Sequence, residues 1–111
     1  MNILQFLESM NIDPNDYLRL AKKAAKSNGY NPSYLELSDK EKYKLKYKNI
    51  YFGATLYRDF LIYTILMKKG QFTEDYINKR RYSYLTRSAG IKGDWMYDKY
   101  SKNNLARNIL W

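Results

Sequence analysis

The sequence predicts one α+β domain over residues 1–111, with four to five helices packed on a small two- or three-stranded antiparallel sheet. Apolar residues recur at three- and four-residue spacing in both halves of the chain, as in amphipathic helices. Between residues 34 and 52 the spacing changes to two, which is typical of strands. The chain is 45% hydrophobic and 17% aromatic, which is enough for one core and argues against intrinsic disorder.

Two helices are expected in the first 30 residues. Apolar residues at helical spacing from Ile3 to Met10 predict a short first helix. Asp13-Pro14 then has the pattern of an N-cap followed by proline at the first helical position. Asn28-Gly29 is a typical helix stop, so the second helix should end near Ser27.

A hairpin and a third strand should follow. The segments Tyr34–Leu37 and Tyr43–Tyr47 both alternate apolar and polar residues around the polar stretch 38–42. Ile50–Phe52 predicts a short third strand, and Gly53 should form the bend into the next helix. Along 43–48 we expect Tyr43, Leu45 and Tyr47 to face the core, and Lys44, Lys46 and Lys48 to face water.

Three further helices complete the prediction. The most apolar segment, Leu56–Lys69, should lie centrally, and Thr73 should cap a helix that ends near Ser88. Ser101 should cap a last short helix that contains Leu105, Ile109 and Leu110. We expect this segment and Trp111 to pack into the core, against the sheet; the alternative is a tail that binds a partner.

The composition argues against most catalytic sites. The chain has no cysteine and no histidine, which removes disulfides, thiolate zinc sites and the commonest general base. Phe52-Gly53-Ala54 lacks the further glycines and the Lys-Ser/Thr pair of a phosphate-binding loop. Asp94 and Asp98 have no third carboxylate at a spacing that suits a two-metal site. The sequence therefore predicts no enzyme, no catalytic residue, no cofactor and no metal.

Asp59 stands beside Arg58 in the segment expected to be an apolar helix. A carboxylate there needs a partner, because an unpaired buried charge is costly. We expect a buried structural salt bridge with an arginine of the following helix: Arg80, Arg81 or Arg87.

The charge is high and unevenly distributed. The net charge is +9, and residues 19–48 and 77–111 each carry +6. Such basic blocks attract polyanions. Tyrosines alternate with cations in both blocks, over 43–48 and 79–84, and single-strand binders combine stacking aromatics with phosphate-binding cations. The alternative is that the tyrosines belong to the core and the lysines only solvate the surface.

The first hypothesis is therefore binding to the phosphate backbone of DNA or RNA without sequence specificity. Its candidate contacts are the cations of the two basic blocks that lie on predicted helices and strands. These are Arg19, Lys22, Lys23, Lys26, Lys44, Lys46, Lys79, Arg80, Arg81 and Arg87.

Four segments occur in order over residues 48–111: IYFGATLYRDF, KRRYSYLTR, GIKGDW and YSKNNLARNILW. They resemble a family of small basic proteins, without an assigned activity, of large nucleocytoplasmic DNA viruses and some phages. Members often carry a histidine near the Arg-rich helix, which this chain lacks. The resemblance implies a viral origin. The residues that match the family pattern are Phe52, Gly53, Asp59, Phe60, Arg80, Tyr84, Arg87, Trp95, Leu110 and Trp111.

Together these observations predict a small basic viral protein that binds nucleic acid and is associated with the virion. The alternative is a minor capsid or cement protein whose basic faces contact other virion proteins. The longest apolar patch, Phe60–Met67, is interrupted by Tyr63-Thr64, so we expect no membrane partner. Because Met1–Met10 lacks a basic start, we expect no secretion, and a location in the virion or in the host cytoplasm at the viral factory.

Overall fold

The computed structural model describes residues 3–53 and 58–111. Within these residues it contains five α-helices and a three-stranded antiparallel sheet, which confirms the predicted α+β class. The elements follow one another in this order: α1 (Ile3–Ser9), α2 (Pro14–Ser27), the 3-10 turn η1 (Pro32–Tyr34), β1 (Leu35–Leu37), β2 (Leu45–Tyr47), β3 (Ile50–Phe52), α3 (Phe60–Lys68), α4 (Glu74–Ala89), the 3-10 turn η2 (Trp95–Tyr97), α5 (Lys102–Leu105) and the π-helical turn η3 (Ala106–Leu110).

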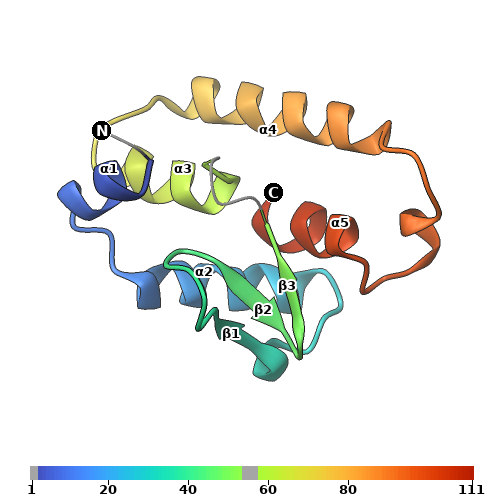
Figure 1. The fold of residues 1–111 in the computed structure, drawn as a ribbon. Coiled ribbons are helices and arrows are strands. Elements are labelled where there is room, and N and C mark those ends of the chain that lie inside the picture. The colour runs from blue at the N-terminus through green and yellow to red at the C-terminus, as the bar shows by residue number, and fades with distance from the viewer. Residues whose placement is uncertain (1–2, 54–57) are drawn as a thin grey trace.

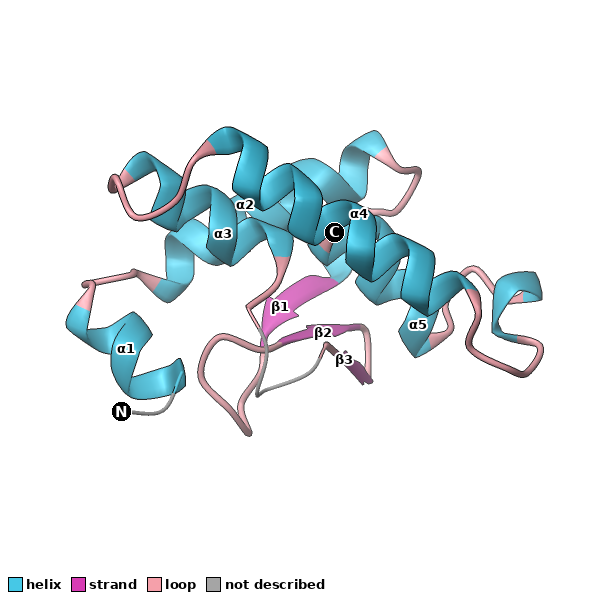
Figure 2. Ribbon diagram, turned by 90° about the horizontal axis from the view of Figure 1, so that it is seen from above, coloured by secondary structure: helices cyan, strands magenta, loops and turns pink. Residues whose placement is uncertain are grey.

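The elements form layers. In Figure 1, α4 runs along the top of the molecule, above α3 and α5, while α2 lies below them and behind the sheet. Figure 2, turned by 90°, shows the small sheet covering one side of the helical layers. The segment that contains α5 and η3 therefore lies between α4 on one side and α2 with the sheet on the other.

The sheet confirms the predicted hairpin and third strand. Its order is β1-β2-β3, with Leu35 opposite Tyr47 and Leu45 opposite Phe52. These four side chains are buried and form the sheet's contribution to the core. The second strand begins later than the alternation predicts, because Tyr43 precedes β2 and has a φ of +59°.

The predicted helix caps are present. Asp13 accepts a hydrogen bond from the Asn15 amide, Thr73 from Tyr76, and Ser101 from Asn104. These side chains satisfy amides that the first turn of a helix leaves without partners.

The predicted start of α3 is wrong. Residues 56 and 57 of the expected helix Leu56–Lys69 lie outside the described part of the chain, and Arg58 and Asp59 are not helical. Asp59 is instead the N-cap, because its Oδ1 accepts a hydrogen bond from the Ile62 amide. Asp59 therefore lies before the helix that was expected to contain it.

The last segment packs into the core, as predicted. Leu105, Ile109 and Leu110 are buried, and their segment packs against α2 and β3. On α2, Ala21 and Ala25 are completely buried and belong to the same core cluster. Alanine has no side chain beyond Cβ, so the two segments can approach closely at these positions.

Trp111 packs on aromatic rings of two helices. It stacks on Tyr84 of α4, with ring centroids 4.1 Å apart, and meets Tyr63 of α3 edge-on at 6.4 Å. Aromatic pairs in these geometries add to the stability gained from burial alone. The predicted docking of the last three residues is therefore confirmed, with α3 and α4 supplying the rings around Trp111.

Gly53 is required at the end of β3 for two reasons. Its φ of +91° lies in the region that side chains rarely adopt. A Cβ atom at this position would also lie 2.8 Å from Leu110 Cδ1, which is too close for a van der Waals contact. Both the bend after the sheet and the packing of Leu110 thus depend on a glycine at position 53.

We expect Gly53→Ala to lower the free energy of unfolding more than Gly70→Ala does. Gly70 has a similar φ of +82°, but a Cβ atom there would meet no other atom within 4 Å. The control therefore carries the backbone strain without the clash, and overpacking a core costs about 1–3 kcal/mol. Chemical denaturation of both variants measures the difference. Equal destabilisation would show that Leu110 moves aside without cost.

Deleting Ile109–Trp111 should leave the protein unfolded or insoluble. Truncating a large core side chain costs about 2–5 kcal/mol, and a small domain has only about 5–15 kcal/mol of stability in total. Leu110→Ala should destabilise the protein less than the deletion does. Its thermal midpoint in circular dichroism should be lower than that of the full chain but still measurable. A truncated chain that melts like the full chain would contradict the docked arrangement.

Candidate functional site

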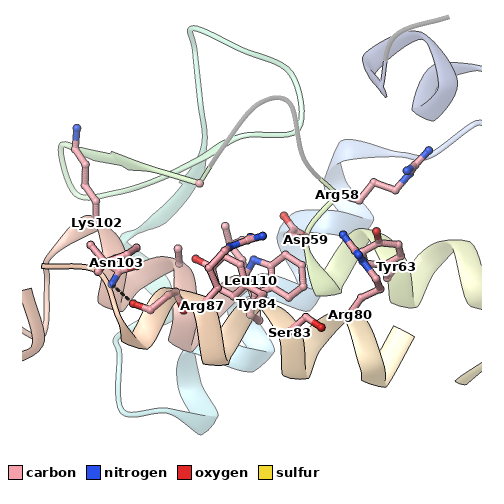
Figure 3. Close-up of a pocket in the computed structure, with 15 residues that line it drawn as sticks. Arg58, Asp59, Tyr63, Arg80, Ser83, Tyr84, Arg87, Lys102, Asn103 and Leu110 are labelled. Carbon is pink, nitrogen blue, oxygen red and sulfur yellow. Dashed lines mark hydrogen bonds between the residues drawn. The ribbon is translucent and has the colours of Figure 1, made fainter. Parts of the chain in front are cut away.

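A cavity of about 500 Å³ lies between α4 and the segment that contains α5. One stripe of α4 and the residues after it form the first wall, because their spacing of three and four places them on the same helix face. This wall consists of Arg80, Ser83, Tyr84, Arg87, Ser88 and Ile91. Figure 3 shows the labelled members of this stripe in a row along α4.

The opposite wall comes from two parts of the chain. The end of β3 and the start of α3 contribute Gly53, Arg58, Asp59 and Tyr63. The last segment contributes Lys102, Asn103, Ala106, Leu110 and Trp111. The docking of the last segment therefore builds the cavity as well as the core.

Arg107 joins the last segment to the end of α4. Its Nη1 donates a hydrogen bond to the Leu85 carbonyl oxygen at 2.7 Å and another to the Ser88 hydroxyl. Its guanidinium also lies 5.6 Å from the ring centroid of Trp95. Because the Ser88 carbonyl accepts a further bond from the Asn103 amide, at 3.4 Å, the end of α4 is fixed to α5.

Four cationic side chains line the cavity: Arg58, Arg80, Arg87 and Lys102. Lys102 and Arg58 stand at opposite ends in Figure 3, with Arg80 and Arg87 on α4 between them. Within the described residues, none of the four forms an ion pair with a carboxylate. The positive charges of Arg80, Arg87 and Lys102 are therefore available to an anion in the cavity, whereas the Arg58 guanidinium points away from the other labelled side chains.

Arg58 is held by aromatic rings. Its guanidinium carbon lies 5.0 Å from the ring centroid of Phe6 and 6.0 Å from that of Phe72. Its Nε is buried and has no hydrogen-bond partner among the described residues. Arginine is suited to such a position, since its planar guanidinium stacks on rings and is weakly hydrated.

Asp59 does not form the predicted salt bridge with Arg80, Arg81 or Arg87. Its Oδ1 caps α3, and its Oδ2 accepts a hydrogen bond from the Tyr17 hydroxyl of α2. The residue is 8% exposed, and within the described residues no ion pair joins its carboxylate to an arginine of α4. The prediction that Asp59 is buried was correct, and the prediction of its partner was wrong.

Burial raises the pKa of Asp59 from 3.8 to about 7, although its hydrogen bonds to Tyr17 and to the amides of α3 act in the opposite direction. Burial therefore disfavours the charged form of this carboxyl group. Asp59 is the one acidic residue among the described residues that line the cavity. The positive charge of the four cations is therefore only weakly opposed.

Of the ten cations predicted to contact nucleic acid, the cavity brings together Arg80 and Arg87. Lys79 is exposed elsewhere on α4, and Arg81 is turned toward Phe60 and the Trp111 carbonyl oxygen, to which its Nε donates at 2.7 Å. On α2, the outer face carries the exposed cations Arg19, Lys22, Lys23 and Lys26.

Lys44 and Lys46 do not face water freely, which corrects the prediction for this strand. Their side chains are only 22% and 21% exposed, and they form ion pairs with Glu41 at 3.7 Å and Glu36 at 3.5 Å. Arg19 similarly pairs with Asp16 at 3.8 Å. Neighbouring carboxylates thus partly neutralise these three candidates.

Sequence reasoning missed Arg58, Ser83, Lys102 and Asn103 as members of the site. The helical spacing of Arg80, Tyr84 and Arg87 was the signal available for the α4 wall. No comparable signal links Arg58 to Lys102, because only the folded chain brings the two ends together.

Comparison of the chain with known protein families, with curated proteins and with solved structures finds no match. The described helices include none with the length and apolar character needed to span a membrane. In the same part of the chain, no three His, Cys, Asp or Glu side chains form a group that could hold a metal ion.

Asp59 should make the stability of the protein pH-dependent. The native pKa of about 7 exceeds the unfolded value of 3.8, so the native state binds more protons between these pH values. The free energy of unfolding should therefore fall as the pH rises from about 4 to about 7, by about 4 kcal/mol from this group alone.

Asp59→Asn is the matched variant for this test, because asparagine also caps helices but does not ionise. The difference in unfolding free energy between the two proteins, from denaturation at several pH values, should shift in favour of the variant over this range. A difference independent of pH would mean that Asp59 is not buried as described.

Proposed function

We propose that the protein binds nucleic acid through its phosphate backbone, and that the cavity between α4 and α5 receives the phosphates. The observation that carries this proposal is the set of four cations, from three parts of the fold, that line one cavity without an ion-pair partner among the described residues. Arginine and lysine side chains are common phosphate ligands in proteins, because their charge and N–H donors match the phosphate oxygens.

The distribution of ion pairs favours the cavity over the other basic surfaces. The four ion pairs found in residues 3–53 and 58–111 all lie in the first half of the chain, outside the cavity. The chain carries a net charge of +9, and four of its cations line the cavity without a carboxylate partner among the described residues. A concave surface focuses the electric field and raises the local concentration of anions.

The neutral groups of the cavity suit the same ligand. The Ser83 hydroxyl and the Asn103 amide can donate hydrogen bonds to phosphate or sugar oxygens, which position a nucleic acid without reading its sequence. A volume of about 500 Å³ is typical of sites that hold a small molecule. The cavity thus has room for one or two nucleotide units of a strand.

A second candidate function is contact with other virion proteins, as in a minor capsid or cement protein. The segment after α4 favours it, because Ile91, Met96 and Tyr97 expose large apolar side chains close together in the sequence. Such exposed apolar surface is a feature of protein interaction sites. Complexes that survive high salt would support this candidate, whereas phosphate contacts weaken steeply with salt. The viral origin itself rests on the sequence resemblance.

Binding to duplex DNA should weaken linearly in a plot of log affinity against log salt. Each phosphate contact contributes about −0.9 to the slope, so replacing both Arg80 and Arg87 by alanine should flatten the slope by up to about 1.8. Fluorescence anisotropy with a labelled oligonucleotide at several salt concentrations measures this slope.

The matched control is Lys22→Ala/Lys23→Ala, which removes two exposed cations from α2. This double variant should change the slope much less than the variant of Arg80 and Arg87. Equal effects would mean that the net charge acts as a whole and that the cavity is not the site. Absence of binding to single strands and duplexes at about 50 mM salt would overturn the proposed function.

A further inference from the structure

Four tyrosines from separate parts of the chain form a cluster outside the cavity, which we call the tyrosine cluster: Tyr30, Tyr34, Tyr47 and Tyr100. The rings of Tyr47 and Tyr100 are stacked, with centroids 5.7 Å apart and an interplanar angle of 19°. Tyr30 and Tyr34 meet Tyr47 edge-on at 5.7 and 6.0 Å. Both geometries are favourable for aromatic pairs.

The cluster has an inner and an outer layer. Tyr30 and Tyr47 are buried, and their hydroxyls are fixed by hydrogen bonds to the backbone of Lys99 and Asn31. Tyr34 and Tyr100 form the outer layer and are 46% and 41% exposed. The buried rings therefore hold two exposed rings in place, and little conformational entropy remains to be lost when a ligand contacts them.

Two lysines flank the exposed rings. Lys48 Nζ lies 4.7 Å from the Tyr34 centroid and 5.7 Å from that of Tyr100. Lys99 Nζ lies 4.9 Å from the Tyr30 centroid and 5.8 Å from that of Tyr100. Asp98 accepts a hydrogen bond from the Tyr100 amide, but within the described residues no ion pair joins it to either lysine.

We propose that the tyrosine cluster, with Lys48 and Lys99, binds unpaired bases of single-stranded nucleic acid. This inference rests on the proposed function and adds a preference for single strands. Exposed aromatic rings stack on bases of any sequence, and adjacent cations bind the phosphates between them. In a duplex the faces of the bases are covered by their neighbours, so only the phosphate contacts remain available.

The position of the cluster relative to the cavity is consistent with one strand contacting both. Tyr100 lies two residues before Lys102, which stands at one end of the cavity in Figure 3. A strand whose phosphates enter the cavity can therefore leave it past Lys102 and reach Tyr100. The cavity would then supply charge, and the cluster would supply stacking.

The test compares a labelled single-stranded oligonucleotide with a duplex of the same length in fluorescence anisotropy. Tyr34→Leu/Tyr100→Leu keeps apolar volume but removes the aromatic faces, and it should weaken single-strand binding roughly tenfold or more while leaving duplex binding within about twofold. Tyr82→Leu is the matched control, because Tyr82 is 74% exposed on the side of α4 opposite the cavity stripe. It should change neither affinity.

Lys48→Gln/Lys99→Gln gives a second readout that keeps all four aromatic rings. It should flatten the salt dependence of single-strand binding by up to about 1.4, since each phosphate contributes about −0.7 on single strands. An unchanged slope would overturn the inference. So would a tyrosine variant that binds single strands like wild type, or one that loses single-strand and duplex binding equally.

These outcomes are distinct from failure of the proposed function. If the Arg80 and Arg87 variant loses binding while the tyrosine variant does not, the cavity remains the site and the cluster is only part of the core. If the wild-type protein binds neither oligonucleotide, both proposals fail.

Discussion

The close packing of the last segment against α2 and β3 is the contact on which most of the structure depends. Leu105, Ile109 and Leu110 are buried there because the opposite surfaces carry small residues. Ala21 and Ala25 of α2 belong to the same core cluster, and Gly53 leaves room for Leu110 at the end of β3. A larger side chain at any of these positions would separate the segment from the layer below it, because protein interiors have few voids that could absorb the volume.

Both candidate surfaces follow from this contact. On the side toward α4, the docked segment places Lys102 and Asn103 in the cavity, and Arg107 fixes it to the end of α4. On the other side, the Asn108 amide donates a hydrogen bond to the Tyr30 hydroxyl, which belongs to the tyrosine cluster. The same segment therefore stabilises the core and positions charge and aromatic rings, so a variant in it must be tested for folding before any change in binding is interpreted.

The sequence predicted those features that depend on local physical chemistry. Asp13, Thr73 and Ser101 were recognised as caps because capping requires only a short polar side chain before a helical pattern. The burial of Leu105 and Ile109 followed from their helical spacing. The ion pairs of Lys44 and Lys46 were not predicted. They depend on the positions of Glu36, on the neighbouring strand β1, and of Glu41, in the turn before β2. The cavity was missed for the same reason: Arg58 and Lys102 are distant in sequence, and periodicity carries no information about their approach.

Asp59 shows how the requirements of folding and of an anionic site can be met by one residue. As an N-cap and as the acceptor for the Tyr17 hydroxyl, its carboxylate fixes the start of α3 against α2. Burial makes the charged form costly and raises the pKa of the residue to about 7, so the helix cap is a carboxyl group whose ionisation is disfavoured. A fully charged carboxylate at the wall of the cavity would weaken the attraction of Arg80 and Arg87 for phosphate. An anion in the cavity would in turn favour the protonated form of Asp59, because protonation removes the repulsion between them, and such coupling is reciprocal. Because it is buried, Asp59 can cap α3 at the wall of a cavity whose other charged residues are positive.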